Sequence, residues 1–322
     1  MRLNKYTLWI SKIKFIVLFS LVSIFQAVEA APDISYRHGE MVSVGLLDYH
    51  VFCTGSGQST IILESGLGGN YLDWSLLQPI LSKNAVVVCS YDRAGYGWSS
   101  MGEKPRLATR AASEFNDLAA QLKLPRPITF VGHSYGGLIG VAISNLTPRS
   151  VDGLVFLDSM HPNQFERLKN EANVDLPAKP SRAIIFSSPE VIGYGLPESL
   201  ARIAYQISRK PKVRSTLYNE LRNVKKTMLL VDHLKWDQVP AMVLAHGRRD
   251  WDSHSTDGLM EDVWMRLQQD IAARSSGQLF VVDGGHQLQL DNPEDCAEYI
   301  LRFHLARVQA FESQEVIEPR YE

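Results

Sequence analysis

The sequence predicts an α/β fold, built on a mostly parallel sheet with helices on both faces. Strand-like and helix-like segments alternate along most of the 322 residues, which is the pattern of strands joined by crossing helices. Most of the strand-like segments are nearly continuous apolar runs, as strands buried on both faces require. At this length, one domain with an insertion is expected rather than two independent domains.

The predicted strands and helices follow one another along the chain. The first two strands form an antiparallel hairpin at the edge of the sheet. The strands are expected at residues 41–46, 48–53, 60–63, 86–91, 128–131, 153–157, 241–245 and 278–282. The helices are expected at residues 71–81, 109–122, 138–147, 260–274 and 293–311, and a polar tail at 313–322.

Residues 163–237 interrupt this alternation. The segment contains no buried-strand pattern apart from residues 182–186, and it has amphipathic helical stretches at 198–208 and 212–224. A helical insertion between two strands of a sheet is typical of a cap over the site. The segment is also locally basic, which we interpret as a solvated helix face.

The overall composition is that of an ordinary globular enzyme. Hydrophobic residues make up 45% of the chain and charged residues 21%, and the net charge is −2. Proteins that bind nucleic acids normally carry a strong basic excess. The sequence therefore gives no support for a nucleic-acid partner.

The first 30 residues resemble a secretory signal peptide. Basic residues precede an apolar run at 15–25, and compact residues occupy the positions before Ala31. The run is shorter than the about 20 residues that cross a bilayer. Cleavage after Ala30 is therefore favoured over an uncleaved membrane anchor, and the protein is expected to be exported, as a periplasmic or secreted protein.

The chain has three cysteines, Cys53, Cys89 and Cys296. An oxidising compartment permits one disulfide and leaves one thiol over. Cys53 and Cys89 fall at the end of one predicted strand and within another. Either a bridge between them or three buried cysteines is compatible with the sequence.

A G-x-S-x-G motif at residues 132–136 lies between a predicted strand and a predicted helix. This arrangement is typical of the nucleophile elbow of serine hydrolases. Small residues on either side of the serine allow the sharp turn that exposes its hydroxyl. Ser134 is therefore the candidate nucleophile.

A serine nucleophile needs a histidine base and a carboxylate that orients this base. His286 lies in the loop after the last strand, where such a base is expected. Asp250, in the loop after the strand at 241–245, is the favoured acid. Asp158, at the end of the strand at 153–157, and Asp252 are the alternatives.

The oxyanion that forms during acyl transfer needs two backbone donors. The N–H of Tyr135 is one candidate, because it directly follows the nucleophile. The other is expected in the glycine-rich loop after the third strand, at Leu67 or, next to it, Gly68. Gly66, Gly68 and His133 are expected to contact the substrate.

Five motifs together resemble the α/β-hydrolase superfamily over nearly the whole mature chain. They are LESGLGG (63–69), YDRAGYGWS (91–99), GHSYGG (132–137), HGRRD (246–250) and GGHQLQLDNP (284–293). The resemblance implies an eight-stranded sheet with a helical cap after strand six, and it implies Ser134, Asp250 and His286 as the triad. In YDRAGYGWS, Asp92 and Arg93 are expected to brace the structure. Many relatives carry His-Gly at the oxyanion loop, where this chain has Ser65-Gly66.

These observations predict an exported serine hydrolase, most simply an esterase that forms an acyl-enzyme on a small or medium acyl substrate. A peptidase, lactonase or amidase with the same triad is the close alternative, and a non-catalytic ligand-binding protein of the same fold is the distant one. The expected partner is a small ester-like molecule. No cofactor is expected, and no metal, since no ligand spacing is recognisable around His246 and His254.

Overall fold

The computed structural model describes residues 37–147, 149–174, 192–249 and 259–317, with side chains as far as residue 314. The chain divides into two compact units, Met1–Arg37 and His38–Glu322, and all the elements below belong to the second. The predicted signal peptide and the strand-like residues 182–186 lie outside the described residues. No helix among the described residues is long and apolar enough to cross a membrane.

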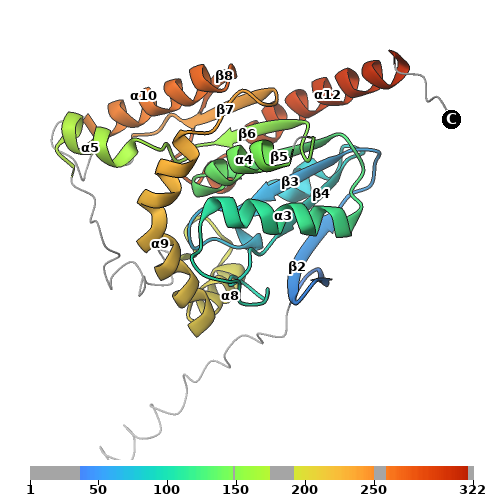
Figure 1. Cartoon of the computed structure of the whole chain (residues 1–322), viewed down its shortest axis with the longest axis horizontal. Coiled ribbons are helices and arrows are strands. Elements are labelled where there is room, and N and C mark those ends of the chain that lie inside the picture. The colour runs from blue at the N-terminus through green and yellow to red at the C-terminus, as the bar shows by residue number, and fades with distance from the viewer. Residues whose placement is uncertain (1–36, 148, 175–191, 250–258, 318–322) are drawn as a thin grey trace, which may run out of the picture. The chain divides into compact units, whose positions relative to one another are not determined.

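The second unit contains a sheet of eight strands in the order β1-β2-β4-β3-β5-β6-β7-β8. The pairs β1–β2 and β2–β4 are antiparallel, and the other neighbours are parallel. The predicted mostly parallel sheet is therefore confirmed (Figure 1). The strands are β1 (Glu40–Val44), β2 (Leu47–Thr54), β3 (Thr60–Glu64), β4 (Val87–Tyr91), β5 (Ile128–His133), β6 (Gly153–Leu157), β7 (Ala241–His246) and β8 (Gln278–Val282).

Helices cover both faces of this sheet, as predicted. On one face, side chains of α3 (Ala108–Leu122), α4 (Tyr135–Leu146) and α10 (Leu259–Arg274) form a core with Phe130 and Phe156 of the sheet. On the other face, α2 (Leu77–Leu81) and α12 (Pro293–Ile317) pack on the alternate side chains of the strands, such as Leu63 and Val155. Burial on both faces explains why these strands are mostly apolar.

The strand register places several strand ends side by side. His133 at the end of β5 lies opposite Leu157 at the end of β6, and Leu157 lies opposite Leu244 of β7. His246, the last residue of β7, lies opposite Val282 of β8. The loops that follow β5, β6, β7 and β8 therefore begin at the same edge of the sheet, which is where α/β sheets place their sites.

Some predicted helices differ from the structure. The predicted helix 71–81 is instead a 3-10 helix, η1 (Tyr71–Trp74), followed by the separate helix α2. Pro79 explains the break, because it lacks the N–H that would bond to the carbonyl of Ser75 in a continuous helix. The last helix is longer than predicted, since α12 continues to Ile317 through residues expected to be a polar tail.

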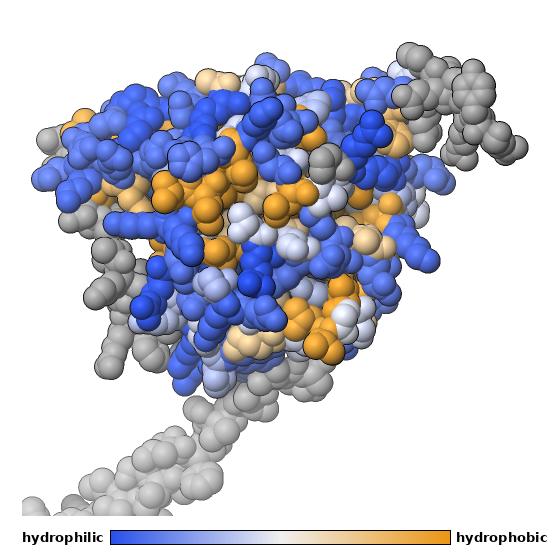
Figure 2. Space-filling model, viewed as in Figure 1, coloured by the Kyte–Doolittle hydropathy of each residue, from blue (hydrophilic) through white to orange (hydrophobic). Residues whose placement is uncertain are grey.

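The described part of the insertion between β6 and β7 is helical. It contains α5 (Gln164–Ala172), α8 (Glu198–Ser208) and α9 (Pro211–Asp232). Apolar residues of α8 pack against η1 and the turn after β4 in one cluster, while α5 packs against α10. Figure 2 shows a mostly hydrophilic face whose apolar side chains gather across the middle, where Figure 1 places α4 and α9.

Cys53 and Cys89 form a disulfide between neighbouring strands. They are directly opposite each other in the antiparallel pair β2–β4. Cys296 is a free, buried cysteine of α12. Of the two possibilities that the sequence left open, the structure has the bridge.

Candidate active site

Ser134 lies at a sharp turn between β5 and α4. Its φ of +51° is in the left-handed region that serine rarely adopts. Glycine is required on both sides, because a Cβ at Gly132 would lie 2.5 Å from the backbone of Gly136, and one at Gly136 would lie 2.6 Å from the carbonyl oxygen of Glu64. Local backbone strain of this kind is typical of functional sites.

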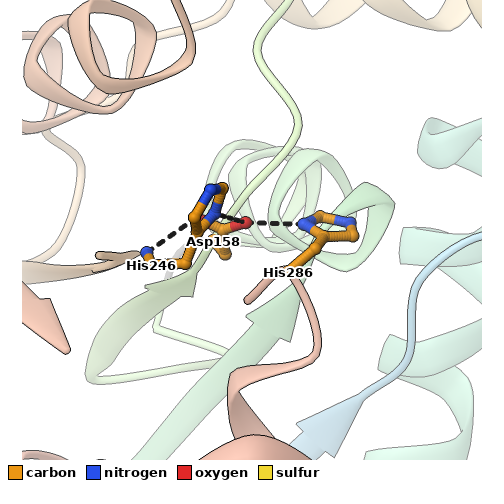
Figure 3. Close-up of side chains that lie close together, drawn as sticks. All are labelled: Asp158, His246 and His286. Atoms are coloured by element: carbon orange, nitrogen blue, oxygen red, sulfur yellow. Dashed lines mark hydrogen bonds and ion pairs between the residues drawn. The ribbon is translucent and has the colours of Figure 1, made fainter. Parts of the chain in front are cut away.

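His286 lies in the loop after β8, and its ring points at Asp158 (Figure 3). The distance from Nδ1 of His286 to Oδ2 of Asp158 is 2.5 Å. A carboxylate oxygen accepts this hydrogen bond, so Nδ1 carries the proton. The second ring nitrogen, Nε2, then has the lone pair that a general base needs.

Asp158 directly follows β6 and is completely buried, with a φ of +43°. Its Oδ2 accepts hydrogen bonds from His286 and His246, and its Oδ1 accepts them from the Trp264 indole and the His246 backbone N–H. Burial raises the pKa of this carboxyl, but the hydrogen bonds from the two histidines outweigh burial and hold the pKa well below its ordinary value. Asp158 is therefore an anion at neutral pH.

The other two candidate acids, Asp250 and Asp252, lie outside the described residues. The choice of Asp250 as the acid stays a prediction. Asp158, the alternative, bonds directly to His286.

His133 connects the elbow to the loop of His286. Its Nε2–H donates to the carbonyl oxygen of His286 over 2.8 Å, and the centroids of the two rings are 4.8 Å apart. Burial lowers the pKa of His133 to about 3, so its ring is neutral. Because His133 adjoins Ser134, this bond fixes the histidine loop beside the nucleophile; contact of His133 with substrate stays a prediction.

The loop after β3 passes directly over the elbow. A Cβ at Gly66 would lie 3.1 Å from the Cβ of Ser134, so this part of the loop contacts the nucleophile. Gly68 has a φ of +78°, and a Cβ there would lie 3.6 Å from the Leu217 side chain of α9. Tyr135, the first residue of α4, is completely buried. The residues predicted as oxyanion donors and substrate contacts therefore belong to segments that flank Ser134.

Arg93 holds the loop after β3 in place through hydrogen bonds. Its guanidinium donates to the carbonyl oxygens of Ser65 over 2.6 Å and of Gly66 over 2.8 Å. It also pairs with Glu64 at the end of β3 and lies 3.4 Å from a carboxylate oxygen of Glu220 on α9. The expected bracing role of Arg93 is confirmed by these contacts.

Asp92 also has a bracing role, as expected. Its carboxylate accepts hydrogen bonds from the backbone N–H groups of Tyr71 and Trp98 and lies 2.8 Å from the His50 ring. These contacts fix the turn after β4 against η1 and β2.

A second histidine contacts Asp158, which the sequence did not suggest. Nδ1 of His246 lies 2.8 Å from Oδ2 of Asp158, and its Nε2 lies 2.8 Å from Oε2 of Glu261 on α10. The sequence placed His246 only at the start of the loop that leaves the strand at 241–245. Nothing in the sequence distinguished Glu261 from the other acids at the start of α10.

Asp158, His246 and His286 each offer one possible ligand atom within 4.8 Å of the others. Both histidines, however, point Nδ1 at the same carboxylate oxygen, at 2.5 and 2.8 Å. Ligands about 2.0–2.2 Å from a tetrahedral metal would lie more than about 3 Å apart. The spacing is therefore that of hydrogen bonds rather than of a metal-ligand set.

A comparison with protein families agrees with this geometry. The model of the alpha/beta hydrolase family matches residues 61–299, which include Ser134, Asp158 and His286. The chain belongs to the alpha/beta hydrolase family.

Some curated proteins resemble parts of this alpha/beta hydrolase. An "AB hydrolase superfamily protein" of Gibberella zeae is 32% identical over 115 residues, which cover 34% of this chain and 35% of the relative. Protein phosphatase methylesterase 1 of Bos taurus is 29% identical over 161 residues, covering 48% of this chain and 41% of the relative. The matched segments thus span less than half of these relatives.

Solved structures of alpha/beta hydrolases match over more of the chain. A "putative epoxide hydrolase" from Pseudomonas aeruginosa superimposes with a TM-score of 0.65 at 19% identity, over 84% of this chain and 96% of that one. At this identity the likeness shows the fold alone.

Proposed function

We propose that this protein is a serine hydrolase whose triad is Ser134, His286 and Asp158. The observation that carries the proposal is the hydrogen bond between His286 and the buried, ionised Asp158 beside a strained serine at a strand–helix turn. The carboxylate fixes the tautomer in which Nε2 of His286 accepts a proton. The order along the chain is serine, acid and histidine, with the acid directly after β6.

In the proposed mechanism, His286 removes the hydroxyl proton of Ser134 as Oγ attacks the substrate carbonyl. The imidazolium that forms is stabilised by Asp158 and returns the proton to the leaving group. This step leaves an acyl group on Ser134 and releases an alcohol. His286 then deprotonates a water molecule, which hydrolyses the acyl-enzyme and regenerates Ser134.

The N–H groups of Leu67 and Tyr135 are the proposed oxyanion donors. Tyr135 opens α4, so its N–H belongs to the positive end of that helix. Leu67 follows Gly66, where an added Cβ would lie 3.1 Å from the Cβ of Ser134, so a larger residue there would crowd the nucleophile. Gly68 and His133 remain proposed substrate contacts.

The hydrogen bonds from Arg93 to the carbonyl groups of Ser65 and Gly66 lead to a testable prediction. Lysine at position 93 keeps the charge but cannot bond to both carbonyls as a planar guanidinium does. We expect Arg93→Lys to lower kcat by about 10²-fold, because Leu67 N–H would be misplaced, with little change in KM. Steady-state kinetics with a chromogenic ester checks this.

Arg106→Lys is the matched control for this variant. Arg106 is equally buried and forms a two-bond pair with Glu114, but it does not contact the oxyanion loop. Equal kcat values for the two variants would refute the role of Arg93 in the loop.

We further propose that the substrate is a carboxylic ester and that the protein is exported. The resemblance to a methylesterase over part of the chain supports ester hydrolysis. The disulfide between Cys53 and Cys89 supports an oxidising compartment, in agreement with the predicted leader. The helices α8 and α9 of the insertion are proposed to cap the site, since a Cβ at Gly68 of the oxyanion loop would lie only 3.6 Å from Leu217 of α9.

The test is hydrolysis of p-nitrophenyl esters of increasing acyl chain length. We expect turnover with an initial burst of nitrophenol equal to the enzyme concentration when deacylation is slow. A panel of aminopeptidase and lactone substrates distinguishes the alternative specificities, because the same triad serves all of them. Folded protein that hydrolyses no member of either panel would instead favour a ligand-binding protein.

A further inference from the structure

His246 occupies a bridging position that the proposed triad does not explain. It ends β7, its side chain is 3% exposed, and its two ring nitrogens face two different carboxylates (Figure 3 shows the Asp158 side). Nδ1 lies 2.8 Å from Asp158 and Nε2 lies 2.8 Å from Glu261. The backbone N–H of the same residue donates to the other oxygen of Asp158.

The number of protons in this cluster follows from the geometry. A neutral imidazole has one N–H and can donate to only one carboxylate, whereas an imidazolium donates from both nitrogens. Each ring nitrogen of His246 faces a carboxylate oxygen, which accepts. The arrangement therefore holds His246 as a cation with both of its protons bonded.

The same arrangement determines the direction of Asp158. Three donors besides His286 reach its carboxylate: the ring and backbone of His246 and the indole of Trp264. Two of these three come from one residue, which β7 places rigidly beside β6. These donors fix the orientation of the carboxylate, so that Oδ2 of Asp158 also points at Nδ1 of His286. The distance between these two atoms is 2.5 Å.

We propose that His246 is a positioning residue of the active site, a buried imidazolium held between Glu261 and Asp158 that keeps Asp158 ionised and aimed at His286. This inference rests on the proposed triad. His246 itself does not touch substrate in this account; it acts through Asp158, and Glu261 acts through His246.

Among the described residues, the charged and titratable groups that face His246 come from three elements. Asp158 follows β6, Glu261 lies on α10, and His286 reaches the cluster from the loop after β8 on the far side of Asp158. Burial lowers the pKa of His246, but the two carboxylates outweigh burial and raise it to about 9. As the pH rises through this value, His246 loses a proton and with it one of its two hydrogen bonds to the carboxylates. Its contribution to the ionisation and orientation of Asp158 then declines.

Two amide variants separate the two nitrogens of His246. Asparagine places an N–H near the position of Nδ1 and can still donate to Asp158, whereas glutamine places it near Nε2 and can reach only Glu261. We expect His246→Gln to lower kcat for a p-nitrophenyl ester by about 10²-fold with little change in KM. His246→Asn should lose roughly tenfold or less, because the donor to Asp158 is kept.

The pH profile is the second measurement. The wild-type kcat should decline above pH about 9, and this alkaline limb should be absent in both His246 variants. Glu261→Gln should move the limb to lower pH, since one of the two carboxylates that raise the pKa of His246 is removed.

His304→Gln is the matched control. His304 is also buried with both ring nitrogens bonded, but its partners are the hydroxyls of Ser59 and Thr129. The variant His304→Gln should lower thermal stability without changing kcat or the alkaline limb of its pH profile. A merely structural role for His246 predicts the same outcome for His246→Gln, and equal kcat values for the Gln and Asn variants would overturn the proposal.

Labelling with a fluorophosphonate distinguishes this failure from failure of the proposed function. If wild-type protein reacts at Ser134 and the His246 variants have wild-type kinetics, only the role of His246 is wrong. If folded wild-type protein does not react at all, the proposed triad itself is wrong, and the role of His246 fails with it.

Discussion

Replacing Ser134 with alanine is expected to lower kcat for ester hydrolysis by about 10⁶-fold, which is the size of loss seen when a serine hydrolase loses its nucleophile. The fold should be unaffected, since alanine removes only the hydroxyl and the strained turn is supported by backbone bonds. These bonds run from Ser134 N–H to Leu157 and from Met160 N–H to Ser134. Initial rates with a chromogenic ester, together with the thermal unfolding midpoint, measure both effects.

Ser144→Ala is the control for this variant. Ser144 lies on the same helix, α4, and is also buried; its hydroxyl donates to the carbonyl of Val141 and accepts from the amide of the neighbouring Asn145. It should keep wild-type activity. Residual ester hydrolysis in Ser134→Ala close to the wild-type rate would show that another residue is the nucleophile.

Replacing Asp158 with asparagine is expected to lower kcat by about 10⁴-fold, the loss typical of a triad whose acid no longer fixes the histidine tautomer. The amide cannot accept from all four of the donors around position 158, so thermal stability should also decrease. Asp250→Asn is the informative partner, because the sequence favoured Asp250 as the acid. It should retain activity within about tenfold of wild type.

The reverse result, a large loss in Asp250→Asn and a small one in Asp158→Asn, would identify Asp250 as the acid. A large loss in both would indicate that the two carboxylates share the histidine. Measuring kcat for the two single variants and the double variant on one substrate distinguishes these outcomes, since residues that act as a unit are not additive.

Most of the fold could be predicted from the sequence because its strands are buried on both faces. Residues 153–157 and 241–245, for example, are apolar at every position, so their identity as central strands did not depend on distant contacts. The break at Pro79 and the extension of α12 to Ile317 concern element ends, which depend on local backbone bonds that a periodic pattern does not report.

The site was predictable where its residues follow motifs, as at Ser134 and His286. The acid was less certain, because Asp158 and Asp250 both follow a strand that ends at the same edge of the sheet. Only the register of β6 and β7, together with side-chain direction, shows that Asp158 reaches His286. The partners His246 and Glu261 lie 15 residues apart on different elements, so no spacing in the sequence joins them.

The most direct test of the account is the reaction of the folded protein with a fluorophosphonate, followed by mass spectrometry of the peptide that contains Ser134. Such probes require a serine that a neighbouring base activates. We expect one adduct per chain, on Ser134, at a rate strongly reduced in Asp158→Asn and with no adduct in Ser134→Ala. No adduct on Ser134, or an adduct whose rate is the same in wild type and Asp158→Asn, would contradict the triad of Ser134, His286 and Asp158.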